Sequence, residues 1–198
     1  MSDLFLKRGA TYSPCETLRL TLTREWSAEG LTVCYIGHNP STAGHEIDDP
    51  TSQAWVHFGK VNGCGRYVAV NLYPFRSPDP KACRQWADFE NNGPDWWARD
   101  RLQQNIGIVA REAKRADIVV ACWGAIALDD LWNDSVLEEI QSGEAPWPDV
   151  YCFGLTASGA PKHPLARGKH RLPRDQKFIL WKPANVECVP TSKTAANP

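Results

Sequence analysis

Four short apolar runs recur along the chain, and each one gives way abruptly to a polar or glycine-containing turn. They cover residues 31–36, 67–72, 118–122 and 150–155, and they are rich in valine and isoleucine. Runs of this length and composition are typical of β-strands. Because the runs are continuous rather than alternating, they predict strands that are buried on both faces, as in a parallel sheet.

Segments with helical features separate the apolar runs. Asp49 followed by Pro50 is a typical N-cap and first helical residue, which predicts a helix over residues 50–61. Residues 93–95 (Gly-Pro-Asp) predict a second helix start, and a third helix is expected over residues 126–140. The second helix should bury a stripe made of Leu102, Ile106, Val109 and Ala113.

The alternation of strands and helices predicts an α/β fold. We expect a three-layer sandwich in which a central four-stranded, mainly parallel sheet lies between helices. Residues 18–24 alternate apolar and polar side chains, which indicates an extra antiparallel edge strand near the N-terminus, after an irregular lead-in over residues 1–13. Residues 1–182 are expected to form one domain, and the proline-containing residues 183–198 a flexible C-terminal tail.

Composition and charge limit the kinds of function that this protein can have. The chain has 198 residues, 42% of them hydrophobic, and a formal net charge of −1, so no global field draws it to nucleic acid or membrane. The charge is nevertheless uneven, because residues 160–182 hold seven basic residues and one acidic residue. This basic run is either a solvated surface or a loop that contacts an anion.

Other sequence features address compartment and cofactors. Seven cysteines occur without a Cys-x-x-Cys pair, no signal peptide is visible, and no apolar run reaches the ~18 residues of a membrane span. These observations predict a cytoplasmic protein with no membrane partner. No Gly-x-x-x-x-Gly-Lys-Ser/Thr loop or Gly-x-Ser-x-Gly elbow is present, and no cofactor is expected.

Polar and aromatic residues follow the ends of the four predicted strands. Because parallel strands end at one edge of a sheet, these residues should meet in one crevice. They include His38, Asn39, Asn71, Trp123 and His163.

Asn71 and His163 are the most informative of these residues. Asn71 closes an apolar strand, and a buried amide needs partners, so it is either a bridge between loops or a reader of a nucleobase edge. His163 lies in a loop with glycine and proline neighbours, where it could donate a hydrogen bond to a developing anion or act as an acid or base.

The remaining candidates allow two interpretations each. Asn39 before Pro40 is either turn chemistry or a ligand for substrate or water, and Ser41 with Thr42 either caps a turn or joins an anion-binding nest. Phe75 and Trp123 are more simply packing residues. Arg76 and the basic residues near His163, including Arg167 and Lys169, are suited to phosphate.

A metal site is an alternative use of the polar loop after the first strand. His38, His45, Asp48 and Asp49 could supply ligands, but their spacing fits no common ligand pattern. We therefore predict no metal ligands, and keep a metal-assisted phosphohydrolase or transferase that uses Asp48 and Asp49 as an alternative.

Several motifs together resemble an uncharacterised bacterial and phage domain family over about residues 8–170. The motifs are Asn39-Pro40-Ser41-Thr42-Ala43, Asp48-Asp49-Pro50-Thr51, Asn71-Leu72, Trp123-Gly124 and Gly159-x-Pro161-x-His163-Pro164-Leu165.

The same chain is also distantly similar to the uracil-DNA glycosylase superfamily. The similar segments, in the same chain order, are Gly37-His38-Asn39-Pro40, Val68-Ala69-Val70-Asn71, Ala121-Cys122-Trp123-Gly124 and His163-Pro164-Leu165. The resemblance implies a four-stranded parallel sheet between helices. It also implies that Asn39 positions the attacking water, Asn71 reads the base, His163 stabilises the departing base anion and Leu165 enters the duplex as a wedge.

The sequence and the resemblance together predict a nucleobase- or nucleotide-recognising hydrolase that cleaves an N-glycosidic bond of a modified or damaged base, with a role in DNA modification or repair. Expected partners are nucleotides or nucleic acid, including single-stranded or modified DNA. Because Asn39 is an amide and the His-Pro-Leu loop is short, a non-catalytic nucleotide-binding or modified-nucleic-acid-binding protein is the alternative. Asn39 and His163 are the predicted catalytic residues. The predicted substrate-binding residues are His38, Ser41, Thr42, Asp49, Thr51, Asn71, Phe75, Arg76, Trp123, Leu165, Arg167 and Lys169.

Overall fold

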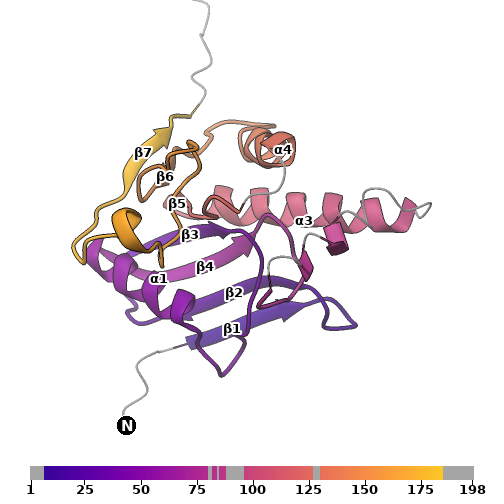
Figure 1. Ribbon diagram of the computed structural model, residues 1–198, viewed down its shortest axis with the longest axis horizontal. Helices are drawn as coiled ribbons and strands as arrows, with labels where there is room; N and C mark the ends of the chain where they lie inside the picture. Colours follow the sequence, from indigo (N-terminus) through magenta and orange to yellow (C-terminus); the bar gives the residue numbers. More distant parts are fainter. Residues whose placement is uncertain (1–6, 80–81, 84, 88–95, 127–129, 185–198) are drawn as a thin grey trace, which may run out of the picture.

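A seven-stranded mixed sheet forms the centre of the computed structural model, which describes residues 7–79, 82–83, 85–87, 96–126 and 130–184 (Figure 1). The strand order is β1-β2-β4-β3-β5-β6-β7. The strands are β1 (Lys7–Tyr12), β2 (Arg19–Glu25), β3 (Leu31–Gly37), β4 (Cys64–Asn71), β5 (Ile118–Ala121), β6 (Val150–Cys152) and β7 (Ile179–Lys182). The four inner strands β4, β3, β5 and β6 are parallel, whereas β1, β2 and β7 pair in antiparallel fashion at the two sides.

The expectation of a four-stranded sheet was therefore wrong in number. The four apolar runs form the parallel centre, but three further strands extend it. β1 lies in the segment expected to be irregular, and it places β2 inside the sheet rather than at its edge. Strand β1 lacks an apolar run, whereas β7 contains the apolar residues Ile179, Leu180 and Trp181 but is mostly exposed. Both lie at edges of the sheet, so backbone pairing defines them more than side-chain burial does.

Helix α1 (Pro50–Val61) has the bounds that the sequence predicted. Its first turn is closed by a capping box in which the Asp49 carboxylate accepts the Ser52 N–H at 2.8 Å and the Asp49 N–H donates to the Ser52 hydroxyl at 3.0 Å. The cap fixes the backbone at residue 49, so the position of its carboxylate is determined by the start of the helix.

Further helices are α3 (Trp96–Arg115), α4 (Asp130–Ile140) and the short 3-10 helix η1 (Gly168–His170). The predicted stripe of α3 is buried at all four positions, Leu102, Ile106, Val109 and Ala113. The predicted helix start at residues 93–95 lies outside the described residues, as do residues 127–129 of the third predicted helix and residues 185–198 of the predicted tail. None of the helices in the described ranges combines the length and apolarity needed to cross a bilayer.

Two hydrophobic cores lie on opposite faces of the sheet, which explains the continuous apolar runs. In β3, Cys34 and Ile36 belong to the core beneath α3 and α4, whereas Val33 and Tyr35 belong to the core beneath α1. Figure 1 shows this layering, with α1 on one side of the sheet and α3 and α4 on the other. Because each face is covered, every side chain of the strand must be apolar or well packed.

The sheet order creates a switch point between β3 and β5. After β3 the chain passes through α1 to β4 on one side, whereas the connection that follows β4 crosses to β5 on the other side of β3. Loops that leave neighbouring strands in opposite directions open a crevice at their carboxyl ends, and open α/β sheets place ligands there.

Candidate functional site

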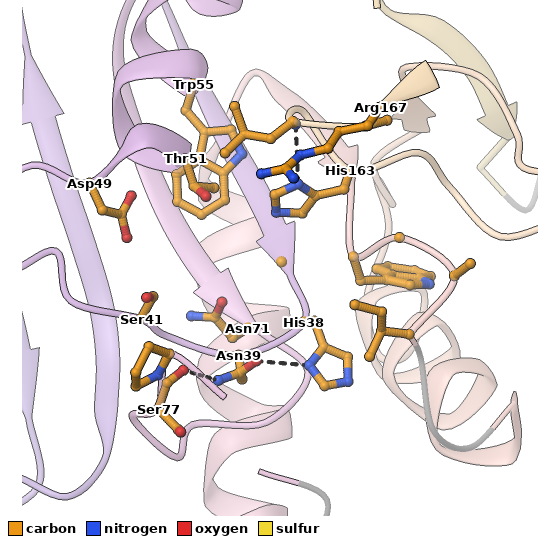
Figure 2. A pocket seen from close by; sticks show the side chains of 18 of the residues that line it. His38, Asn39, Ser41, Asp49, Thr51, Trp55, Asn71, Ser77, His163 and Arg167 are labelled. Carbon is orange, nitrogen blue, oxygen red and sulfur yellow. Dashed lines mark hydrogen bonds between the residues drawn. The ribbon is translucent and has the colours of Figure 1, made fainter. Parts of the chain in front are cut away.

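A cavity of about 620 Å³ occupies this crevice. Its volume is within the range of small-ligand sites. Ten of the predicted site residues line it: His38, Asn39, Ser41, Asp49, Thr51, Asn71, Trp123, His163, Leu165 and Arg167. They come from the loops after β3, β5 and β6, from the last residue of β4 and from the start of α1 (Figure 2).

Four other predicted residues lie away from the cavity lining, namely Thr42, Phe75, Arg76 and Lys169. Phe75 stacks on Trp86 with ring centroids 5.3 Å apart. The Arg76 guanidinium donates to the Glu16 carbonyl at 2.9 Å and lies over the Tyr12 ring. Both side chains are used in packing the loop after β4.

Arg19 and Trp55 are cavity residues that sequence reasoning missed. Arg19 begins β2 and is only 2% exposed, and its guanidinium donates to the Ala43 carbonyl at 2.8 Å. Burial lowers its pKa to about 10, although the Asp49 charge opposes this shift. The alternating pattern of β2 gave no reason to place Arg19 inward, and only the neighbouring strands make that face the interior. Ser77, Thr156 and His170 complete the polar lining that was not predicted.

Trp55 supplies an aromatic wall. It is 4% exposed, and its ring stacks on Tyr35 of β3 with centroids 5.5 Å apart and an interplanar angle of 11°. Gly37 keeps this wall close to β4, because a Cβ at residue 37 would lie 2.9 Å from the Asn71 Oδ1 and 3.4 Å from the Trp55 ring. The apolar run of β3 therefore ends in glycine where the cavity begins.

Asn71 lies at the middle of the site, between the two sides of the cavity drawn in Figure 2. It is 2% exposed, and neither Nδ2 nor Oδ1 has a hydrogen-bond partner among the described residues. Leaving a buried donor or acceptor without a partner costs about 1–3 kcal/mol, so the pair is expensive for a purely structural residue. An amide placed in this way offers one donor and one acceptor to a ligand in the cavity.

The backbone around Asn71 is held rigidly from the α3 and α4 face. The Asn105 side chain of α3 donates to the carbonyls of Asn71 at 3.0 Å and Leu72 at 3.2 Å. The Trp132 indole of α4 donates to the same Leu72 carbonyl at 3.0 Å. These bonds fix the end of β4 and so the position of the Asn71 side chain.

Asn39 joins two loops rather than projecting freely into the cavity. Its Nδ2 donates to the carbonyls of Ser77 at 2.9 Å and Pro40 at 3.1 Å, and its Oδ1 contacts the His38 Nδ1 at 3.0 Å. Because an amide oxygen can only accept, His38 donates from Nδ1. Most of the hydrogen-bonding capacity of Asn39 is thus used within the protein.

His163 is held in one tautomer. Its Nδ1 accepts the Leu165 N–H at 3.1 Å, so in the neutral ring the proton is on Nε2. Burial is the main cause that lowers the pKa of His163 to about 4; the His38 charge also lowers it, and the Asp49 charge opposes the shift. At neutral pH, His163 is therefore an uncharged donor.

Gly124 allows this loop to approach. Its φ of 78° lies in the left-handed region, and a Cβ there would lie 3.2 Å from the His163 Cβ. The Gly124 N–H also donates to the Pro161 carbonyl at 2.9 Å, which ties the loop after β5 to the loop carrying His163. The glycine of the Trp123-Gly124 motif thus helps to position His163.

The lowered pKa of His163 gives a testable pH dependence of stability. An unfolded histidine has a pKa of about 6.5, so between pH 6.5 and pH 4 the unfolded chain binds a proton that the folded chain excludes. The free energy of unfolding should therefore fall as the pH drops through this interval, by at most about 1.4 kcal/mol per pH unit from this group. Denaturant titrations at several pH values should show that the free energy of unfolding of His163→Gln falls less steeply between pH 6.5 and pH 4 than that of the wild type. Equal pH dependence of the free energy of unfolding in the two proteins would contradict the lowered pKa of His163.

Among the described residues that line the cavity, Asp49 is the one with a carboxylate side chain. It is 8% exposed. One oxygen accepts the Ser52 N–H in the helix cap. The Asp49 charge acts on both Arg19 and His163, since it raises the pKa of each against the effect of burial. A negative charge is thus held near a cation and a neutral imidazole.

The neighbouring Asp48 faces a different environment. It accepts the Arg24 Nε–H at 2.8 Å and pairs with Arg8 at 3.3 Å, and Arg24 is 1% exposed. Asp48 is outside the cavity lining, and no group of three or more potential metal-binding side chains was found within the described ranges. The two aspartates therefore lie in different surroundings.

Comparison with protein-family models identifies a match. The model for proteins of unknown function (DUF1643) matches residues 19–165, well over half of the chain. The chain belongs to the DUF1643 family. This confirms the resemblance to an uncharacterised domain family. Comparisons with curated proteins and with solved structures give no match.

The DUF1643 match coincides with the site. It begins at Arg19 and ends at Leu165, so it includes Asp49, Asn71 and His163 and all four parallel strands. The arginine-containing segment that follows Leu165 lies beyond the matched part of this DUF1643 chain.

Proposed function

We propose that this protein binds a nucleobase in the cavity and hydrolyses the N-glycosidic bond that links the base to its sugar. The observation that carries the proposal is the buried amide of Asn71, whose donor and acceptor have no partner among the described residues. An amide of this kind can pair in two places with the donor–acceptor edge of a base. The distant resemblance to uracil-DNA glycosylases points to the same ligand class.

Two side chains that line the same cavity as this amide suit the chemistry. As the bond between C1′ and the base nitrogen breaks, its electron pair leaves with the base, and the Nε2–H of neutral His163 donates to the resulting anion. Water attacks C1′, and the Asp49 carboxylate accepts the proton that the water loses. The base anion takes up a proton from solvent and Asp49 releases its proton to solvent, so the products are the free base and a sugar with a hydroxyl at C1′.

Asp49 takes the part that the resemblance implied for Asn39. Asn39 is a neutral amide, and its nitrogen already donates to backbone carbonyls. It cannot accept a proton, whereas Asp49 can. We therefore assign Asn39 to positioning the loop after β3 and His38, and the carboxylate role to Asp49.

The same Asn39 contacts favour one alternative, a protein that binds a nucleotide without hydrolysing it. Such a protein needs the Asn71 amide and the Trp55 wall but no activated water. The alternative predicts tight binding without release of free base, which a single assay of both quantities distinguishes.

The test is release of free base from nucleosides and oligonucleotides that carry a panel of modified and damaged bases, measured by liquid chromatography. We expect Asn71→Leu to lower base release by about 5- to 150-fold, corresponding to the roughly 1–3 kcal/mol of a bidentate amide–base pair. The same variant should be more stable than the wild type, with a free energy of unfolding about 1–3 kcal/mol higher. The reason is that the substitution removes two buried polar atoms that have no partner among the described residues.

Asn105→Leu is the matched control for the stability effect. Its buried Nδ2 donates to two carbonyls, so this variant should be less stable than the wild type. A loss of stability in Asn71→Leu would contradict the ligand-binding assignment of Asn71. Absence of base release from every substrate of the panel would overturn the hydrolase.

A further inference from the structure

A second cavity of about 740 Å³ adjoins the first. The two share Leu165, Ala166 and Arg167, so the loop that carries His163 forms the ridge between them. The far side of the second cavity is the exposed flank of α1, which includes Pro50 and His57. We call this second cavity the arginine groove, because Arg167, Arg171 and Arg174 all line it.

No carboxylate among the described residues that line the arginine groove balances its positive charge. Its lining contains no acidic side chain in the described part of the chain. The three guanidiniums are on exposed residues, and none of them forms a salt bridge or hydrogen bond with the described residues. Surface arginines are usually hydrated individually, but three that converge on one concave surface favour an anion.

The segment carrying the arginines is fixed to α1. The His57 Nε2–H donates to the Arg174 carbonyl at 2.8 Å, and the Phe178 N–H donates to the Asn62 Oδ1 at 3.0 Å. Between the arginines, Leu172 is 8% exposed and packs in the core beneath α1. The guanidiniums therefore project from an anchored backbone, which reduces the entropy lost when they bind a ligand.

We infer that the arginine groove binds successive phosphates of a nucleic-acid strand whose target base occupies the first cavity. Guanidinium groups match phosphate oxygens in a bidentate manner, and three of them exceed what the single phosphate of a mononucleotide needs. Leu165, which is 40% exposed on the ridge, offers an apolar contact to the base next to the target.

This assignment rests on the proposed function, because it takes the ligand of the first cavity to be a nucleobase. It adds that the substrate is a polymer rather than a free nucleoside or nucleotide. It also gives the basic run of residues 160–182 a role as a phosphate-contacting surface.

The test measures the affinity of the full chain for a labelled, mixed-sequence single-stranded DNA oligonucleotide at several salt concentrations. Each phosphate contact in a single strand contributes about 0.7 to the slope of log K against log salt. Arg171→Gln/Arg174→Gln should therefore reduce the magnitude of the slope by about 1.4. Arg111→Gln is the matched control, since this arginine lies on α3 and pairs with Glu112, and its slope should equal that of the wild type.

Three outcomes overturn the assignment of the arginine groove. One is an unchanged slope in the double variant, and another is an equal change in the Arg111 control. The third is an equal loss of affinity for a nucleoside 5′-monophosphate, which would assign the arginines to a mononucleotide. Asn71→Leu separates the two proposals, because it should lose base release but keep the wild-type slope. A reduced slope in the double variant without any base release by the wild type would support the groove and reject the hydrolase.

Discussion

Replacing His163 by alanine should lower the rate of base release by about 10²- to 10³-fold, the usual effect of removing one preorganised donor to a developing anion. The expectation follows from the fixed tautomer. The Leu165 N–H occupies Nδ1, so the neutral ring carries its proton on Nε2, the atom that remains for the substrate. His163→Gln keeps a side-chain N–H and should retain part of the activity that alanine loses.

The pH profile provides a second readout of the same residue. Because burial lowers the pKa of His163 to about 4, the ring stays neutral throughout the physiological range. Its protonation should therefore cause no inflection near pH 6.5, and activity should fall only as the pH approaches 4 and the ring gains a proton on Nδ1. His45→Ala is the matched control, since His45 accepts the Ala10 N–H outside the cavity. Full activity in His163→Ala would contradict the assigned role.

Asp49→Asn should lower base release by about 10²- to 10⁴-fold, the range attributed to a positioned acid or base. The substitution is informative because asparagine and aspartate are equally good N-caps. Its amide oxygen can still accept the Ser52 N–H, so α1 should keep its first turn while the carboxylate is lost. The variant separates the chemical part of Asp49 from its structural part.

Ser52→Ala provides the opposite change. It removes the hydroxyl that accepts the Asp49 N–H and donates to Asp48, but leaves the Asp49 carboxylate in place. We expect a loss of about 1 kcal/mol in the free energy of unfolding, with near wild-type base release in the folded protein. If Asp49→Asn retained wild-type rates, Asp49 would be only a helix cap, and the water would have to be activated by another group.

The sequence predicted the parallel centre of the fold well because local rules determine it. The four apolar runs became β3, β4, β5 and β6, and the Asp49-Pro50 pair marked the start of α1. It did not predict β1, which carries no apolar run, or β7, a short apolar segment whose side chains are mostly exposed and which pairs with β6 more than 25 residues earlier in the chain.

The candidate site divides in the same way. The rule that parallel strands end at one edge was enough to bring Asn71, Trp123 and His163 to one cavity. Arg19 and Trp55 were missed because their side chains look like those of an ordinary strand and an ordinary helix. The place of β2 inside the sheet buries Arg19, and the packing of α1 on β3, where Trp55 stacks on Tyr35, turns Trp55 inward.

The sequence by itself therefore determined the four parallel strands, the start of α1, the edge where the site lies and the identity of its amide and imidazole. The tertiary structure decided how each polar atom is used. It engages the Asn39 amide in loop contacts, leaves the Asn71 amide without a described partner, fixes the His163 tautomer and holds Asp49 rather than Asp48 at the cavity. The physical reason is that hydrogen-bond partners and burial depend on residues far apart in the chain, which no local pattern encodes.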